Sequence, residues 1–154
     1  MEIKIVSHEE FAGWTTKLST DIKKYTDENN LRIDYVVPVL RSGAVPAVYI
    51  ANNLNIIKFA PIQVKLVLRD GEEKPEVLLN SLDKLDPKRA WTLLVTEGNF
   101  RTGETVRTAL SEIKKTLPKA KILLACVSAK SKDFPPEALK TFWAYDNTSR
   151  VCFP

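Results

Sequence analysis

The sequence has little cysteine and histidine, and each shortage excludes a class of protein. Among the 154 residues there are two cysteines, Cys126 and Cys152, and one histidine, His8. Two cysteines are too few for a disulfide framework, and no Cys/His cluster has the spacing of a metal site. We expect both cysteines to fill the core, and we expect no catalytic role for His8, which lies far from every motif described below.

The sequence also lacks a long apolar run and a block of one charge. Its apolar stretches, around 35–50, 91–96 and 121–129, are shorter than the ~18 apolar residues of a membrane span. The start, MEIKIVSHEE, lacks the basic-then-apolar pattern of a signal peptide. A net charge of +4 arises from 23 basic and 19 acidic residues. We therefore expect a cytoplasmic protein that binds neither membrane nor nucleic acid, and the mild charge suits a phosphate-rich small ligand.

Apolar residues make up 44% of the chain, enough for one core, so we expect a single domain over 1–154. Ser7 and Glu10 form a capping-box pattern ahead of apolar residues at helical spacing. Elsewhere, continuous apolar runs of strand length are typical of strands buried in a parallel sheet. The expected elements are helix 8–28, strand 33–40, helix 44–54, strands 56–59 and 62–68, strand 90–96, helix 104–117 and strand 119–129. Their alternation predicts an α/β fold with an open, mainly parallel sheet and helices on both faces.

Polar segments follow three of the expected strands, and ligands in such sheets bind beyond the carboxyl ends of the strands. The segments are LRSG (40–43), EGNFRTGET (97–105) and AKSK (129–132). In the second, Thr102, Gly103 and Thr105 offer hydroxyls and backbone N–H groups at a helix start, an arrangement that suits a monophosphate. Taken alone, the same segment also fits an exposed strand-to-helix turn capped by threonine.

The same segment imitates the phosphate loop of nucleotide hydrolases, G-x-x-x-x-G-K-[ST], but departs from it at one residue. Gly98 and Gly103 have the required spacing, and Thr105 follows. Glu104 stands where the lysine should reach the phosphates, and a carboxylate there would repel them. This departure argues against a nucleotide hydrolase.

Four segments, in order along the chain, resemble the type I phosphoribosyltransferases. LLVTEGNFRTGET (93–105) is similar to the family's motif for phosphoribosyl pyrophosphate (PRPP), and VVPVLRSGAVPA (36–47) to its pyrophosphate loop. KILLACVSAKS (121–131) resembles the strand ending in lysine of the 6-oxopurine branch. SRVCFP (149–154) resembles the C-terminal segment of short prokaryotic and archaeal purine enzymes. The resemblance implies the family's fold, with a small hood made from the N-terminal segment and about 130–154.

The resemblance also implies roles for individual residues. Leu40, Arg41, Ser42 and Gly43 would form the pyrophosphate loop, with a cis peptide after Leu40. Thr102, Gly103, Glu104 and Thr105 would hold the 5′-phosphate, with Arg101 at the entry of this loop. Glu97, with Gly98 beside it, would hold the ribose hydroxyls and contribute to the binding of Mg²⁺, which would bridge the pyrophosphate. The residues implied in catalysis are Arg41, Glu97 and Arg101.

On the side of the base, the resemblance implies that Lys130 donates to the 6-oxo oxygen of a purine. Val151 would contact the base through its main chain, and Arg150 occupies the position of the family's stacking aromatic residue. Residues 69–76 would be a mobile loop that closes over the reacting centre. We expect a homodimer.

The chain departs from the family's motifs at several positions. Gly98 replaces one of two acidic residues, Asn99 and Phe100 replace two apolar residues, and Arg101 replaces an aspartate that assists proton transfer. Arginine cannot act as a general base at neutral pH. Two functions therefore remain open: a purine-type phosphoribosyltransferase that releases pyrophosphate, or a catalytically impaired relative that binds PRPP or a nucleotide as a regulator or scaffold.

Some of these residues also have purely structural interpretations. Lys130 fits a surface lysine at a strand end, and Arg41 fits a partner of a neighbouring carboxylate. Glu104 fits a first-turn acid that complements the helix dipole.

Overall fold

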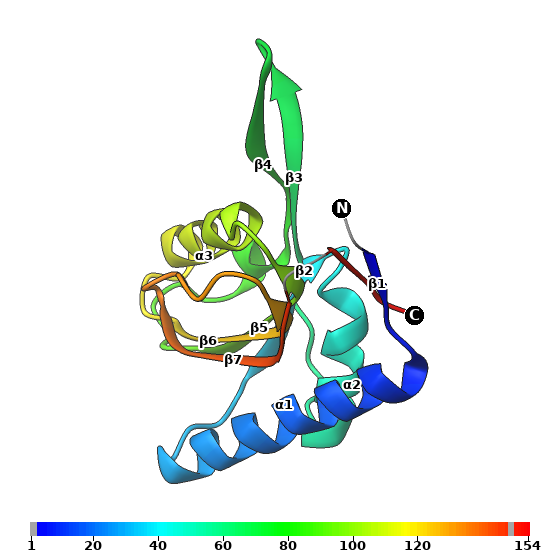
Figure 1. Cartoon of the computed structure of the whole chain (residues 1–154). Coiled ribbons are helices and arrows are strands. Elements are labelled where there is room, and N and C mark those ends of the chain that lie inside the picture. Colours follow the sequence, from blue (N-terminus) through cyan, green and yellow to red (C-terminus); the bar gives the residue numbers. More distant parts are fainter. Residues whose placement is uncertain (1–2, 148–149) are drawn as a thin grey trace.

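The structure is a computed structural model that describes residues 3–147 and 150–154. A six-stranded sheet with the order β4-β3-β2-β5-β6-β7 forms its centre (Figure 1). All neighbouring strands are parallel except β3 and β4, which are antiparallel. The strands are β2 (Tyr35–Leu40), β3 (Ile62–Arg69), β4 (Glu72–Asn80), β5 (Thr92–Phe100), β6 (Lys121–Ala129) and β7 (Ala138–Asp146). A short 3₁₀ helix, η1 (Ser81–Lys84), follows β4.

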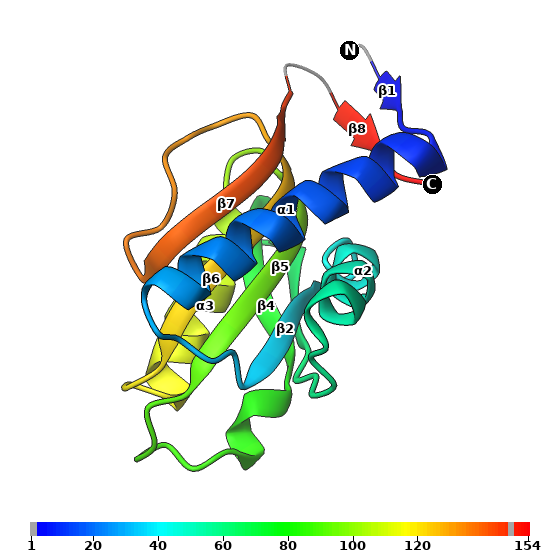
Figure 2. The same cartoon turned by 90° about the horizontal axis from the view of Figure 1, so that it is seen from below.

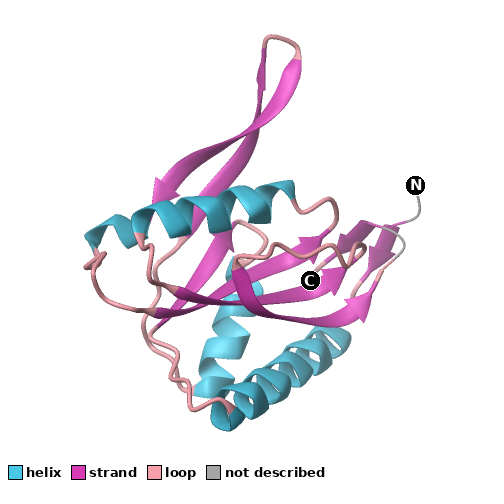
Figure 3. Ribbon diagram, turned by 90° about the vertical axis from the view of Figure 1, so that its left-hand side faces the viewer, coloured by secondary structure: helices cyan, strands magenta, loops and turns pink. Residues whose placement is uncertain are grey.

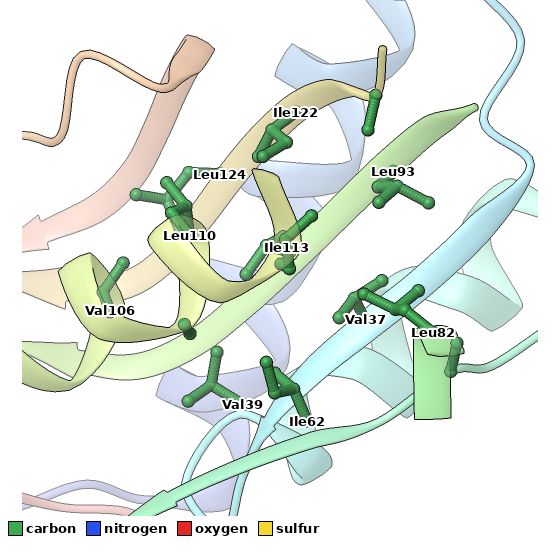
Figure 4. Close-up of a cluster of buried hydrophobic side chains, with 14 of the residues drawn as sticks. Val37, Val39, Ile62, Leu82, Leu93, Val106, Leu110, Ile113, Ile122 and Leu124 are labelled. Atoms are coloured by element: carbon green, nitrogen blue, oxygen red, sulfur yellow. The ribbon is translucent and has the colours of Figure 1, made fainter. Parts of the chain in front are cut away.

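Helices cover both faces of this sheet (Figure 2). On one face, α1 (His8–Glu28) and α2 (Ala44–Leu54) bury Leu18 and Ile50 with Leu94 of β5. On the other face, α3 (Glu104–Thr116) packs its apolar side chains onto β2, β5 and β6, as Figure 4 shows. No helix in residues 3–147 or 150–154 is long and apolar enough to cross a membrane. The α/β fold with an open, mainly parallel sheet and helices on both faces is confirmed.

The helix predictions are the most accurate, because they depend on local signals. Helix α1 has the predicted bounds, and its capping box is present: Glu10 N–H donates to Ser7 Oγ at 3.1 Å, and Ser7 N–H donates to Glu10 Oε2 at 3.1 Å. Helix α2 also has the predicted bounds, and α3 begins at the predicted residue and ends one residue earlier.

Residues 69–76, expected to be a mobile loop, form the tip of the β3–β4 hairpin, which projects from the sheet (Figures 1 and 3). Their mobility and closure stay predictions. Two expectations about strands were wrong. The strand expected to end at residue 96 continues to Phe100, because β6 pairs with it as far as Ala129. Residues 56–59 make one bridge, between Phe59 and Val36, in place of a strand.

A second, two-stranded sheet lies outside the main one. Strands β1 (Ile3–Ile5) and β8 (Arg150–Cys152) pair in parallel (Figure 2). The expected hood segment of about 130–154 was too long, since β7 within it belongs to the central sheet. Whether the small sheet serves as a hood stays a prediction. Cys126 fills the core as expected, but Cys152 is exposed, because it lies on this narrow sheet.

Candidate functional site

A cavity of about 820 Å³ lies beyond the carboxyl ends of β2 and β5. It brings together the two segments expected to bind pyrophosphate and phosphate, because neighbouring parallel strands end at the same edge of a sheet. Its lining residues are Leu40, Arg41, Ser42, Val64, Leu66, Glu73, Glu97, Asn99, Phe100, Arg101, Thr102, Gly103, Glu104, Thr105 and Val106.

The segment after β2 is held against β5. The peptide bond between Leu40 and Arg41 is cis, as the resemblance implied. Gly43 is the N-cap of α2, and its carbonyl oxygen accepts a hydrogen bond from Thr96 Oγ1 at 2.9 Å. Gly43 is buried behind the cavity, whereas Arg41 and Ser42 are exposed and line it. The expected pyrophosphate loop thus presents a cation and a hydroxyl to the cavity.

The segment after β5 opens directly into α3. Gly103 is the N-cap of α3 with φ 82°, and as a glycine it makes no side-chain cap hydrogen bond. Thr102 Oγ1 lies 3.5 Å from the Glu104 N–H, and Arg107 N–H donates to the Gly103 carbonyl at 2.8 Å. The first N–H groups of a helix have no partner within it, and they attract anions. At Thr105 this helix start faces the cavity.

Glu97 is a buried carboxyl group, with 5% of its surface exposed. It accepts hydrogen bonds from the Ser42 hydroxyl and from Gly98 N–H at 2.7 Å. Burial raises the pKa of Glu97 to about 7, although hydrogen bonds from Ser42, Gly98 and Asn99 act in the opposite direction. At neutral pH, Glu97 is therefore present in both its neutral and its charged form.

Metal binding by the protein alone has little support in the described part of the chain. Those residues contain no group of three or more His, Cys, Asp or Glu side chains that could hold a metal ion. Glu97 lines the cavity as one carboxyl group, beside the Ser42 hydroxyl. Magnesium keeps several waters and binds through one or two carboxylates plus phosphate oxygens. These residues fit a magnesium ion that receives most of its ligands from a bound pyrophosphate and water.

Gly98 has no room for the second acidic side chain of the family's motif. A Cβ at this position would lie 2.8 Å from Phe153 Cε2 and 2.9 Å from the backbone oxygen of Ser42. The Phe153 ring is fixed in turn by an edge-on contact with Phe11, at 5.5 Å between centroids. The packing around Gly98 is therefore compatible with glycine and not with a larger residue, and Gly98 does not line the cavity.

The residues expected to contact the base lie outside the lining of the cavity or beyond the described side chains. Arg101 is exposed and lines the cavity, but Lys130 and Val151 are not among the lining residues. Lys130 is exposed just past β6, and its N–H donates to the Phe100 carbonyl at 2.8 Å. Val151 is buried and pairs with Lys4. Arg150 lies on β8, and its side chain falls outside the described residues.

Sequence reasoning missed one wall of the cavity and one polar residue in it. Val64 and Leu66 of β3 and Glu73 of β4 form this wall. The alternation in IQVKLVL indicated that residues 64 and 66 share a face, but it did not indicate what that face covers. Asn99, expected in a loop, lines the cavity from within β5.

Comparisons with known proteins support the fold. No protein-family model and no curated protein matches the sequence. Among solved structures, a purine phosphoribosyltransferase from Pyrococcus horikoshii Ot3 is similar, with a TM-score of 0.75 and 20% identity over 100% of this chain and 93% of that one. A hypothetical protein from Neisseria gonorrhoeae with bound ppGpp has a TM-score of 0.78 and 17% identity, covering 99% and 88%. The xanthine-guanine-hypoxanthine phosphoribosyltransferase of Helicobacter pylori has a TM-score of 0.74 and 14% identity, covering 99% and 92%.

These structures align with nearly the whole chain, so the similarity concerns the complete sheet with its helices and not a single motif. The expectation from the four sequence segments is therefore confirmed at the level of the fold: the chain has the type I phosphoribosyltransferase fold.

Proposed function

We propose that the chain binds PRPP in the 820 Å³ cavity and transfers its phosphoribosyl group to a purine-type base, with release of pyrophosphate. The observation that carries this proposal is the meeting of two segments expected to bind anions, 40–42 and 101–105, in one cavity that the buried carboxyl group of Glu97 also lines. A ligand with a phosphate at one end and a pyrophosphate at the other, joined by a sugar, matches that arrangement.

Each segment then has a defined task. Thr102, Gly103, Glu104 and Thr105 hold the 5′-phosphate through hydroxyl and backbone N–H groups at the start of α3. The 40–43 segment, with Arg41, holds the pyrophosphate. Glu97 accepts hydrogen bonds from the ribose hydroxyls when it is ionised.

The transfer reaction depends more on charged groups that stabilise the leaving pyrophosphate than on groups that transfer protons. Displacing pyrophosphate from the anomeric carbon develops a cation resembling an oxocarbenium ion, while negative charge collects on the leaving group. Arg41, which lines the cavity, neutralises part of that charge. Magnesium, bound with PRPP, would neutralise more of it.

Lys130, Arg150 and Val151 would contact the base from beside the cavity. Lys130 follows β6 and its backbone pairs with Phe100, the residue before Arg101, so its ammonium group can approach a base held at this edge.

We also propose that the protein acts as a cytoplasmic homodimer. Support for the dimer comes from Val45, Val48 and Tyr49, apolar residues on α2 that are 45%, 51% and 39% exposed. Light scattering of the purified protein would measure its oligomeric state.

A second function, binding of a nucleotide without transfer, is favoured by two observations at the site. Phe153 leaves no room for the second acidic side chain at Gly98, and Arg101 replaces the proton-transferring aspartate. The Neisseria gonorrhoeae protein of similar fold was solved with bound ppGpp. In this case the same cavity would hold the phosphates of a regulatory nucleotide.

One experiment separates the two functions. Calorimetry measures binding of PRPP with Mg²⁺, and a pyrophosphate assay follows the addition of hypoxanthine, guanine, xanthine or a pyrimidine base. Binding with pyrophosphate release supports the transferase, and binding without release supports the regulator. Failure to bind PRPP or any nucleotide contradicts both.

A matched pair of variants tests whether the phosphate lies at α3. Thr105→Val removes a hydroxyl at the cavity, and we expect PRPP to bind about tenfold more weakly, the effect of losing one hydrogen bond to a charged group. Thr108→Val, one turn further along α3 and away from the cavity, should leave the affinity unchanged. Equal affinities for the two variants would argue against phosphate binding at this helix start.

A further inference from the structure

Three polar side chains form a closed hydrogen-bonded cluster at the edge of the cavity. Asn99 of β5 and Ser128 of β6 are paired in register, and Asn147 follows β7. Ser128 Oγ donates to Asn99 Oδ1 at 3.0 Å. Asn147 Nδ2 donates to Asn99 Oδ1 at 2.8 Å and to Ser128 Oγ at 2.9 Å. Ser128 and Asn147 are 0% and 4% exposed, so this polar cluster is held in place by the core around it.

The cluster fixes which way the Asn99 amide points. Both lone pairs of Asn99 Oδ1 are used inside the cluster. In the present orientation, Asn147 Oδ1 is buried without a hydrogen-bond partner. If both amides were turned over, the NH₂ group of Asn147 would take this place, and a buried NH₂ group without an acceptor costs more free energy than a buried oxygen without a donor. The Asn99 NH₂ group therefore points out of the cluster.

We infer that this NH₂ group is directed to the cavity. It has no acceptor among the described residues, and Asn99 is half-buried and lines the cavity. Successive side chains of a strand alternate between faces, so Asn99 lies on the same face of β5 as Glu97, one position nearer to Arg101.

We propose that Asn99 is a specificity-determining residue: its NH₂ group donates a hydrogen bond to a carbonyl oxygen or an unprotonated ring nitrogen of the base. Ser128 and Asn147 are its positioning residues. This inference rests on the proposed function, since it assigns a contact to the ligand of the same cavity. The resemblance implies an apolar residue at position 99, which would contact a base without distinguishing its polar groups.

The variant Asn99→Asp tests the proposal with little change in shape. Its carboxylate still accepts from Ser128 and Asn147, but it presents an oxygen acceptor to the cavity in place of a donor. Calorimetry with IMP, GMP, UMP and ribose 5-phosphate gives, for each nucleotide, the ratio of its affinity to that of ribose 5-phosphate. The added negative charge weakens all four ligands, so this ratio isolates the contribution of the base.

We expect the ratio for IMP and GMP to fall at least tenfold in N99D. A second measurement needs only the wild-type protein: the side-chain NH₂ resonance of Asn99, assigned through its own backbone, should shift with IMP and not with ribose 5-phosphate. Ser128→Ala should lower the same ratio and displace that resonance before any ligand is added, an effect that a purely structural serine would not have.

Two different results would overturn the proposal, and they distinguish an error about Asn99 from an error about the proposed function. If wild type binds ribose 5-phosphate and IMP, while N99D keeps the ratio and the Asn99 resonance does not respond to IMP, the inference about Asn99 is wrong and the proposed function stands. If wild type binds none of the four ligands, the proposed function fails, and the inference fails with it.

Discussion

At the scale of single residues, Glu97 combines deep burial with a position at the cavity. Its three hydrogen-bond donors lower the energy of the charged form, but the loss of water raises it by more. The carboxyl group is therefore easily protonated while no ligand is bound. A ribose or a cation at the cavity would favour the charged form, so ligand binding and proton release by Glu97 are expected to be coupled.

The variant Glu97→Gln should change how stability depends on pH. The folded protein has a Glu97 pKa of about 7, above the ordinary 4.5, so this group contributes its full stability below about pH 4.5 and loses it as the pH rises through 7. The total loss is about 3 kcal/mol of unfolding free energy. Glutamine has the same shape and no charge, so the difference between variant and wild type should grow in favour of the variant from pH 5 to pH 8.5. Urea unfolding at both values measures it, and parallel pH profiles would contradict the assignment.

Arg101 exchanges a proton acceptor for a permanent cation at the cavity. We expect Arg101→Asp to loosen PRPP binding by about 1–3 kcal/mol, the range for a hydrogen bond to a charged group, and to raise the rate of purine transfer. The two constants are measured for both proteins with hypoxanthine and guanine. If wild type already turns over these bases rapidly and the substitution abolishes transfer, the arginine assists catalysis and our interpretation is reversed.

At the scale of elements, the sequence predicted the helices better than the strands. Helix signals are local: the capping box at Ser7 and the spacing of apolar residues lie within one segment. The end of β5 depends on pairing with β6, which lies elsewhere in the chain, so the polar residues from Glu97 onward, taken alone, indicate a loop. The β3–β4 hairpin has a local signal in the sequence. Asp70 and Gly71, with φ 53° and 80°, form the Asp-Gly pair that hairpin turns prefer.

The start of α3 offers a test of the element that holds the phosphate. Gly103 has φ 82°, and an added Cβ would lie 2.5 Å from Phe100 Cζ and 2.6 Å from Arg107 Nη1. We expect Gly103→Ala to lower the unfolding free energy by about 1–3 kcal/mol and to weaken phosphate binding.

Gly13 is the control, because it is an exposed glycine in α1 and an added Cβ would have nothing within 4 Å. Gly13→Ala should stabilise the protein by about 0.5–1 kcal/mol, because alanine favours helix. Equal stability of the two variants would contradict the strain at Gly103.

At the scale of the whole molecule, the meeting of the two loops was predictable from topology, and the details of their surroundings were not. Neighbouring parallel strands bring their carboxyl ends to one edge, so LRSG and the 97–105 segment had to converge. Phe153 fills the space at Gly98 only because the C-terminal strand returns to α1, a contact between the two ends of the chain that no local pattern specifies.

The β1–β8 pair joins segments from opposite ends of the sequence, and this has a consequence for local opening. Each strand has three residues, and Ile3 and Ile5 are 54% and 82% exposed. Pairing the two strands closes a loop that contains most of the sequence, which is costly in entropy. Such a unit should open while the central sheet stays folded, exposing its amides to hydrogen exchange.

Phe153 follows β8 directly and lies against Gly98, which in turn lies beside Ser42, so opening of this pair would also loosen the packing next to the expected pyrophosphate loop. We expect PRPP with Mg²⁺ to slow amide exchange in residues 4–6 and 151–153, none of which lines the cavity, as well as in 102–106. Exchange measured by mass spectrometry would contradict this coupling if only the second region became protected. With both regions protected, a substrate at the strand ends would be holding the two ends of the polypeptide together.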